Sequence, residues 1–193
     1  MEVKRADLNR FESPRLLIEE LRVSDFAFLN ELLNTEGFLK YIGDRNIRSD
    51  GQAKDYIFKT LKKDSTQYWV AKLKPELEPA GLVSFVKRDF LPYRDIGFAF
   101  LPRHMGRGYA YEAVRATLIR IPVEHDKEMV LAITDKCNKS SIRLLEKLKF
   151  EYQKEVDNDG EILSVYGIDT AKLAGLVQNS VVPHLKTEGN SGL

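Results

Sequence analysis

The chain has 193 residues, of which 43% are hydrophobic and 31% charged, an ordinary composition for one globular domain. Its net charge of +1 excludes the strongly basic character of most nucleic-acid-binding proteins. No run approaches the roughly 20 apolar residues that a membrane span requires, and the charged N-terminal segment has no apolar core typical of a secretory signal. We therefore expect neither a nucleic-acid partner nor a membrane partner.

One cysteine, Cys137, excludes an internal disulfide and predicts a cytoplasmic protein. The three histidines, His104, His125 and His184, are too scattered to suggest a metal site, so we expect no metal. Because no repeat or Gly-, Pro- or Ser-rich linker divides the chain, we expect a single domain over residues 1–182. The polar residues 183–193 predict a flexible C-terminal tail.

The first half of the chain reads as a strand, two helices and a run of strands. RLLIEEL at 15–21 is a short strand, and Ser24 precedes a helical pattern of apolar residues that it would cap. A second helix follows, with Asp50 as its expected cap. Alternating and β-branched residues predict three further strands at 67–73, 81–88 and 95–101.

The second half adds two helices and three strands. A helix is expected from near Gly108 to Pro122, followed by a continuous apolar strand at 128–134. Asn138 opens the next helix, and the tetrapeptide DNDG at 157–160 joins two strands in a hairpin. The strand–helix–strand unit would be a right-handed crossover between parallel strands, whereas the hairpins are antiparallel. The fold class is therefore α/β, with a mixed, mostly antiparallel sheet and helices on both faces.

A glycine turn lies within PRHMGRGYAYEAV at 102–114, where Gly106 and Gly108 precede the helix. A helix start leaves up to about four backbone N–H groups unpaired, and the helix dipole makes that end positive. Glycines let the backbone approach a ligand, and Arg103 and Arg107 add charge. These features favour a phosphate-type site, and a plain helix start with solvent-facing arginines is the alternative. Neither the P-loop nor the dinucleotide-binding spacing is matched.

The stretch IGFAFLPRHMGRGYAYEAV at 96–114 resembles the acetyl-CoA signature of the GNAT superfamily of N-acetyltransferases, and it is most similar to the RimJ/RimL-like branch. A second block, NKSSIRLLEKLKF at 138–150, resembles that branch's N-x-x-S-x-x-L-L-E-K-L-G-F. The order of elements matches the GNAT fold from residue 15 to about residue 169. Two blocks in the right order and at the right separation are more specific than either alone.

The resemblance implies that acetyl-CoA is the co-substrate and that its pantetheine inserts between splayed parallel strands. The backbone of Phe98, Ala99 and Phe100 would pair with pantetheine, and an N–H there would polarise the thioester carbonyl. The pyrophosphate would lie on a cradle formed by Arg103, Gly106, Arg107, Gly108, Tyr109 and Ala110. Asn138 would contact the cofactor, cap its helix, or do both.

The implied chemistry is direct attack by an amine on acetyl-CoA. A lysine-like amine with a pKa of about 10.4 arrives protonated, so a base or water relay must accept a proton. By position in the family motif, Asp95 is the candidate base. Its structural alternative is an ion pair with Arg94 or another surface base. Ser141 is the candidate donor to the leaving thiolate, or else a first-turn serine that satisfies helix N–H groups.

This sequence departs from the family pattern at several positions. Leu145 stands where many GNAT enzymes have a proton-donating tyrosine, and Tyr166 is a possible substitute or a packing residue. Ala99 and Met105 replace aromatic residues, which changes the acyl and acceptor pocket. Lys149 replaces the glycine that usually ends the helix and, at positive φ, would cost about 1 kcal/mol. His104, within the phosphate turn, is expected to be a phosphate contact or a surface histidine.

The acceptor amine would be a protein N-terminus or a small-molecule amine. By family analogy the segment at 38–52 lines its site, but the mixed charges there do not choose between acceptors. No cluster of carboxylates typical of a polyamine site is evident. The alternative function is a non-catalytic acyl-CoA-binding or sensing module, which the same glycine turn would serve. A homodimer is the assembly often found in this branch.

Overall fold

The structure is a computed structural model that describes residues 9–121 and 129–173. The expected flexible tail at 183–193, the expected helix stop at Pro122 and two of the histidines, His125 and His184, lie outside the described residues.

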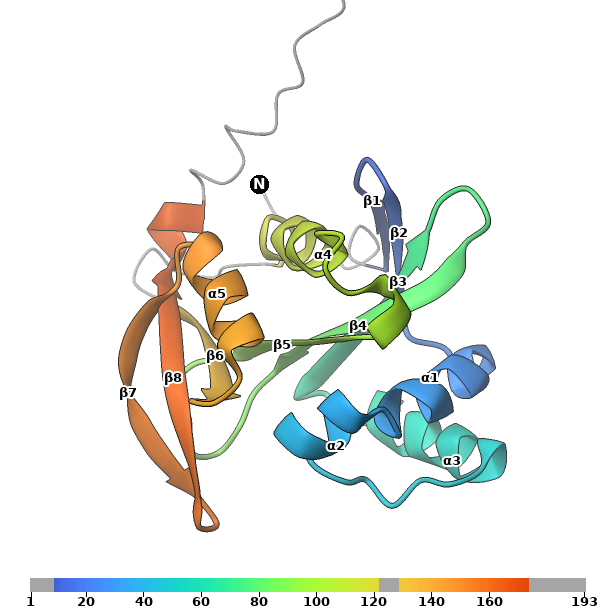
Figure 1. Ribbon diagram of the computed structural model, residues 1–193, viewed down its shortest axis with the longest axis horizontal. Helices are drawn as coiled ribbons and strands as arrows, with labels where there is room; N and C mark the ends of the chain where they lie inside the picture. The colour runs from blue at the N-terminus through green and yellow to red at the C-terminus, as the bar shows by residue number, and fades with distance from the viewer. Residues whose placement is uncertain (1–8, 122–128, 174–193) are drawn as a thin grey trace, which may run out of the picture.

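One eight-stranded sheet forms the centre of the molecule, in the order β1-β2-β3-β4-β5-β6-β8-β7 (Figure 1). Every neighbouring pair is antiparallel except β5 and β6, which are parallel and share a single register pair, Asp95 with Leu131. The predicted mixed, mostly antiparallel sheet with one splayed parallel pair is confirmed. The strands are β1 (Arg10–Glu12), β2 (Leu16–Glu20), β3 (Thr66–Leu73), β4 (Glu78–Val86), β5 (Asp95–Phe100), β6 (Met129–Asp135), β7 (Glu151–Asn158) and β8 (Glu161–Asp169).

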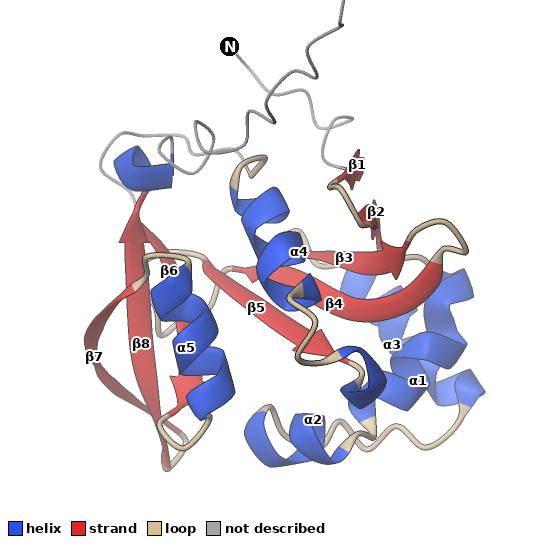
Figure 2. Cartoon of the chain, turned by 45° about the horizontal axis from the view of Figure 1, so that its top comes forward, coloured by secondary structure: helices blue, strands red, loops and turns tan. Residues whose placement is uncertain are grey.

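The helices cover both faces of this sheet, as predicted (Figures 1 and 2). One face carries α4 and α5, and the other carries α1, α2 and α3 over β3 and β4. The described α-helices are α1 (Phe26–Leu33), α2 (Glu36–Tyr41), α3 (Asp50–Leu61), α4 (Tyr109–Leu118) and α5 (Lys139–Lys147).

Each face has its own hydrophobic core. On the α4 and α5 face, Val114 and Leu145 pack with buried strand residues such as Trp69 and Ala132. On the other face, apolar residues of α1 and α3 pack with β3, β4 and the end of β5; they include Leu29, Leu32, Ile57, Val70 and Leu82. Because β5 contributes to both cores, its alternating side chains point to opposite compartments.

Two predicted helix caps are wrong. Ser24 lies inside a short 3-10 helix, Val23–Asp25, in which the Arg22 backbone N–H donates to the Asp25 carboxylate at 2.9 Å, and α1 begins only after it. Asp50 is the first residue of α3, whereas Ser49 caps that helix by accepting from the Gln52 N–H. In the second case Ser49 has the extended backbone of an N-cap residue, whereas Asp50 is already helical.

Four other local features were either missed or confirmed. Strand β1 and the six-residue helix α2 were not expected; Thr35 caps α2 by accepting from the Phe38 N–H at 3.4 Å. Lys149 has φ of 70°, as predicted for the residue that ends α5. Asp159 and Gly160 both have positive φ, so the expected hairpin turn is confirmed as a tight two-residue connection between β7 and β8.

Candidate acetyl-CoA and acceptor site

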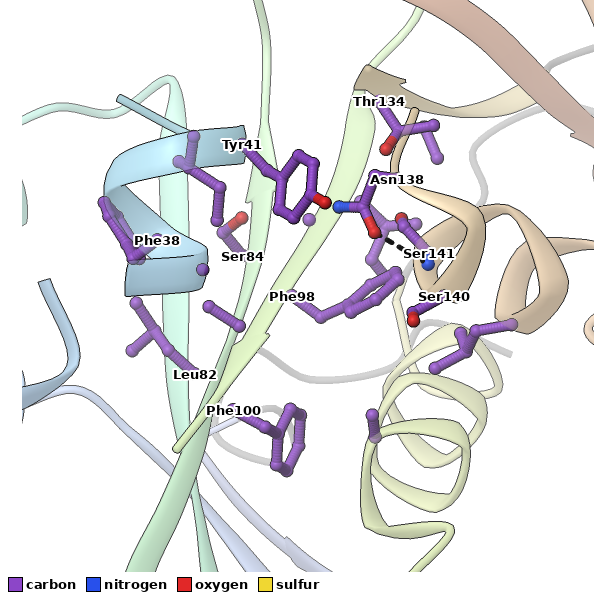
Figure 3. A pocket seen from close by; sticks show the side chains of 18 of the residues that line it. Phe38, Tyr41, Leu82, Ser84, Phe98, Phe100, Thr134, Asn138, Ser140 and Ser141 are labelled. Atoms are coloured by element: carbon purple, nitrogen blue, oxygen red, sulfur yellow. Dashed lines mark hydrogen bonds between the residues drawn. The ribbon is translucent and has the colours of Figure 1, made fainter. Parts of the chain in front are cut away.

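The sheet is split between β5 and β6. After the single pair formed by Asp95 and Leu131 the two strands separate, so the β6-facing main-chain groups of Ile96–Phe100 have no strand partner within the described sheet. A cavity of about 970 Å³ occupies this gap and is lined by residues from both faces of the sheet (Figure 3). Such a gap offers main-chain donors and acceptors to an extended ligand.

The glycine turn forms one end of this cavity. Gly106 and Gly108 have φ of 73° and 79°, in the left-handed region that glycine tolerates and other residues avoid. Gly108 is the N-cap of α4 and makes no side-chain cap bond, so the first N–H groups of the helix have no intrahelical acceptor. Both glycines line the cavity with Tyr109 and Ala110, as the sequence predicted for a phosphate cradle.

Arg15, on the loop between β1 and β2, secures this turn and was missed by the sequence analysis. Its Nη1 donates to the Arg107 carbonyl at 2.9 Å, and its Nε donates to Glu112 Oε2 at 2.7 Å. The guanidinium lies 4.5 Å from the Tyr109 ring centroid. Burial alone would raise the pKa of Glu112, but hydrogen bonds from Arg15 and from the Ser13 hydroxyl together lower it. The turn is therefore held in shape by charged contacts from a loop distant in sequence.

The two arginine side chains of the motif are not brought to the cavity. Arg103 forms ion pairs with Glu31 and with Glu78, the latter at 3.2 Å, and it lines a separate small pocket. The exposed Arg107 does not line the cavity, and its carbonyl accepts from Arg15. The main-chain groups of the glycine turn therefore line the cavity as expected, whereas the side chains of Arg103 and Arg107 do not.

His104 is a buried residue, so the surface-histidine reading is wrong. Its side chain is 6% exposed, and its Nε2 lies 3.2 Å from Glu78 Oε1. The other ring nitrogen, Nδ1, is buried and has no hydrogen-bond partner among the described residues. His104 also contributes to the cavity wall beside the glycine turn.

Helix α5 lines the cavity opposite β5. The Asn138 side chain accepts a hydrogen bond from the Ser141 N–H at 3.1 Å, so its capping role is confirmed. Asn138, Ser140 and Ser141 all line the cavity beside Phe98 (Figure 3). Ser140 was not singled out in the sequence, although it immediately precedes the predicted Ser141.

Tyr41, at the end of α2, belongs to the segment 38–52 that the family resemblance places at the acceptor site, although the sequence analysis did not single it out. Its phenol points across the gap toward Asn138 (Figure 3). It places a hydroxyl near the N-terminus of α5, where Leu145 is fully buried and has no donor. Tyr166, considered earlier as a substitute donor, does not line the cavity; it is buried with its ring centroid 5.8 Å from that of Tyr152.

Asp95 lines the cavity and is ion-paired with Arg88. Its side chain is 1% exposed, with Oδ1 2.7 Å from Arg88 Nε and Oδ2 3.3 Å from Arg88 Nη2. The structural alternative considered for Asp95 is therefore present, with Arg88 in place of Arg94. Burial raises the pKa of Asp95, and the Arg88 guanidinium opposes that rise. Its role as a base stays a prediction.

Strand alternation divides the cavity into two sides. Phe98 and Phe100 face the α4 and α5 core, whereas Ala99 packs toward the helices of the other face. On that second side lie Tyr68, Ser84 and Gly97, which are directly opposite one another on β3, β4 and β5. The remaining wall of this acceptor side comes from the α1–α3 region and is formed by Leu29, Leu33, Phe38, Tyr41, Arg45 and Tyr56.

No group of three or more His, Cys, Asp or Glu side chains within residues 9–121 and 129–173 is arranged to hold a metal ion. None of the helices in this part of the chain is both long and apolar enough to cross a membrane.

Comparison with known families identifies the class of protein. The model described as "Acetyltransferase (GNAT) domain" matches residues 15–151. The chain therefore belongs to the GNAT acetyltransferase family, a family of acetyl-CoA-dependent N-acetyltransferases.

Two relatives from Bacillus subtilis (strain 168) are similar in sequence. The uncharacterized protein YkkB is 34% identical over 100 residues, which cover 51% of this chain and 58% of YkkB. The uncharacterized N-acetyltransferase YnaD is 28% identical over 134 residues, which cover 69% of this chain and 78% of YnaD. This chain thus spans little more than half the length of YkkB and about three quarters of YnaD.

Solved structures share the fold. A GNAT-family acetyltransferase from Bacillus anthracis has a TM-score of 0.70 at 22% identity, covering 84% of this chain and 99% of that one. The spermidine N-acetyltransferase of Vibrio cholerae, solved with CoA and spermine, has a TM-score of 0.70 at 15% identity, with coverage of 84% and 99%. At these identities the likeness concerns the fold alone.

Proposed function

We propose that this protein transfers the acetyl group of acetyl-CoA to a primary amine by direct nucleophilic attack, and that it is a cytoplasmic member of the RimJ/RimL-like branch. The acceptor is a protein N-terminus or a small-molecule amine. The observation that carries the proposal is the split between β5 and β6, whose cavity ends at the glycine-capped N-terminus of α4.

The residues around the cavity fit acetyl-CoA. The N–H groups from Gly106 to Ala110 and the positive end of α4 suit a pyrophosphate, since anions bind at helix N-termini. The unpaired edge of β5 at Phe98, Ala99 and Phe100 suits the amides of pantetheine, and Asn138 approaches from α5. The cavity of about 970 Å³ is at the upper end of the usual range for ligand sites. When bound, acetyl-CoA supplies an acetyl group activated as a thioester.

Asp95 would accept the proton of the incoming ammonium group. It lies on the acceptor side, and its raised pKa brings the carboxylate closer to the neutral range in which a general base is most efficient. Arg88 keeps enough of the carboxylate ionised to act. A β5 N–H would stabilise negative charge on the acyl oxygen.

Two hydroxyl groups would protonate the leaving thiolate. Ser141 reaches the cavity from α5, and Tyr41 reaches it from α2 on the opposite wall. A thiol pKa of about 8.5 makes this the least demanding proton transfer of the reaction. Such a thiolate departs readily, so a hydrogen bond from either hydroxyl is enough to assist its departure.

The test is calorimetric titration with acetyl-CoA and with dephospho-CoA, followed by a thiol-release screen over an amine library. We expect micromolar binding that is lost in Gly108→Asp, and amine-dependent thiol release. Slow acetyl-CoA hydrolysis without an amine would separate an enzyme from a non-catalytic acyl-CoA-binding module, since a module should show none. A folded protein that binds no form of CoA would refute the proposed function.

A further inference from the structure

The acceptor side of the cavity has an unusual balance of charge. Its carboxylate, Asp95, is already bound by Arg88 through two contacts. Arg45 also lines this side, and it has no carboxylate partner among the described residues, because the neighbouring Asp44 pairs with Arg48. The formal charge of these three lining groups is therefore +1 rather than negative. A second ammonium group on an acceptor would find no free carboxylate here.

Tyr68 lines the same cavity as these charged groups. Tyr68, on β3, is mostly buried, and burial is the main cause that raises its pKa. Tyr56 and Asp95 raise the pKa further, whereas Arg88 and Arg45 lower it. Both guanidinium groups therefore act electrostatically at the Tyr68 hydroxyl, which has no hydrogen-bond partner among the described residues.

Apart from the hydroxyl groups of its tyrosines and of Ser84, much of the acceptor side is apolar. Leu29, Leu33 and Leu82 are buried, and Phe38 closes the wall from α2 (Figure 3). Ala99 projects from β5 into the same compartment, so this strand leaves space where a larger side chain would fill it. The guanidinium of Arg45 lies 6.0 Å from the Phe38 ring centroid, at the edge of this apolar wall.

We propose that the acceptor is a small amino carboxylate with an apolar or aromatic side chain, whose amine lies at Asp95 and whose carboxylate lies at Arg45 and Arg88. This inference rests on the proposed function, because it names the acceptor of the same reaction. An α-amino acid has a positive amine and a negative carboxylate side by side, and the Arg88–Asp95 pair offers a neighbouring negative and positive group to match them. Guanidinium groups recognise carboxylates by paired N–H donors.

Glu161, on the far wall at the start of β8, is the remaining carboxylate of the cavity among the described residues. It is exposed and lies on β8, which is on the other side of the β5–β6 gap from β5 and Asp95. A polyamine acceptor would need Glu161 to bind one of its ammonium groups. Polyamines are therefore the alternative class of acceptor that the experiment must compare with amino carboxylates.

The experiment measures kcat/KM for L-phenylalanine and for L-phenylalaninamide, with glycine and spermidine as comparisons. The ratio of acid to amide is determined in wild type, Arg45→Gln and Arg45→Lys. Taking this ratio within each protein cancels the different amine pKa values of the two compounds. Lys59→Gln is the matched control, since Lys59 is exposed on α3 and does not line the cavity.

We expect the acid-to-amide ratio to fall about 10-fold or more in Arg45→Gln, to fall less in Arg45→Lys, and to stay unchanged in Lys59→Gln. Glycine, without an apolar body, should be a poorer acceptor than phenylalanine. An unchanged ratio in Arg45→Gln, or a higher kcat/KM for spermidine than for any amino carboxylate, would overturn the inference.

Acetyl-CoA titration of the same protein samples distinguishes a failure of the inferred acceptor class from a failure of the proposed function. Normal acetyl-CoA binding together with no acetylation of any amino carboxylate overturns this inference and leaves the proposed function intact. Failure to bind acetyl-CoA overturns the proposed function, and the inference with it.

Discussion

The two sides of β5 present different kinds of chemical group to the cavity. The side facing α4 and α5 offers main-chain groups: an unpaired strand edge, a glycine turn and a helix N-terminus. The side facing α1–α3 offers side chains from scattered elements, including Tyr41, Tyr68 and the Arg88–Asp95 pair. Main-chain sites require particular backbone conformations, so they leave motifs in the sequence. Side-chain sites of this kind leave none, because the fold alone brings their members together.

The largest effect that would sharpen this comparison is expected at Gly108. The substitution Gly108→Asp puts a Cβ at φ of 79° and a carboxylate at the expected phosphate position. Strain and charge repulsion together should weaken acetyl-CoA binding about 100-fold. Calorimetric titration of wild type and variant with acetyl-CoA measures this loss of affinity.

Gly160→Asp is the matched control for that variant. Gly160 also has positive φ, 87°, but it lies in the β7–β8 turn and does not line the cavity. It should lose comparable thermal stability while binding acetyl-CoA normally. Equal loss of binding in both variants would show that the effect arises from folding, and would break the distinction between the two regions.

On the acceptor side, Tyr41→Phe should lower kcat by about 10- to 100-fold, with acetyl-CoA affinity unchanged, because one proton donor to the thiolate is lost. Tyr166→Phe is its control, since that tyrosine is buried away from the cavity. Steady-state thiol-release assays compare the two. If the Tyr166 variant shows the larger loss of kcat, the assignment of Tyr41 is wrong.

Arg88→Gln tests the base. A carboxyl group with a raised pKa stays protonated to higher pH, so the reactive fraction of Asp95 increases as pH rises through that pKa. Arg88 lowers the pKa of Asp95, so without it that pKa should rise further. The acidic limb of the kcat/KM profile should therefore move to higher pH. By linkage, the raised carboxyl pKa favours the folded state at low pH, so the variant's loss of stability should grow as pH rises.

Arg94→Gln provides the comparison for that pH profile. The Arg94 guanidinium lies 5.5 Å from the Phe85 ring centroid, and the ion pair of Asp95 is with Arg88 instead, so the limb should stay in place. A shift of the acidic limb in the Arg94 variant alone would contradict the pairing of Asp95 with Arg88.

The smallest effect is expected at Glu112. Glu112→Gln removes the charge that holds Arg15 beside the glycine turn, and should cost about 1–2 kcal/mol of stability and a few-fold in acetyl-CoA affinity. The lowered pKa of Glu112 stabilises the fold above its ordinary value of 4.5, and this contribution is lost as pH falls through the folded-state pKa. Melting temperatures of wild type and variant should therefore converge at acid pH; a constant difference would contradict the charged role.

The fold was largely predictable from the sequence, because long apolar patterns and glycine-marked turns determine the central elements. Helix α2 was missed since it is six residues long and carries a single buried apolar residue, Phe38. Ser24 was misjudged because the Asp25 carboxylate closes a tighter turn first.

The partner of Asp95 illustrates why the site was only partly predictable. Val86 is the cross-strand partner of Asp95, and Arg88 follows it by two residues, on the same side of the chain. Arg94, the neighbour in sequence, points to the other side. Register therefore selects Arg88, and register is known only once the strands are paired. Arg15 was unpredictable for a similar reason, whereas Tyr41 and Arg45 belong to the segment 38–52 that the family resemblance already placed at the acceptor site.

Amide hydrogen exchange with and without acetyl-CoA tests the central claim most directly, because it reports on the main chain that the proposed cofactor site uses. We expect new protection at Ile96–Phe100 and at Gly106–Ala110, with none along the exposed edge strand β7. Binding of acetyl-CoA without protection of β5 and the glycine turn would contradict the account, and would place the cofactor elsewhere on the molecule.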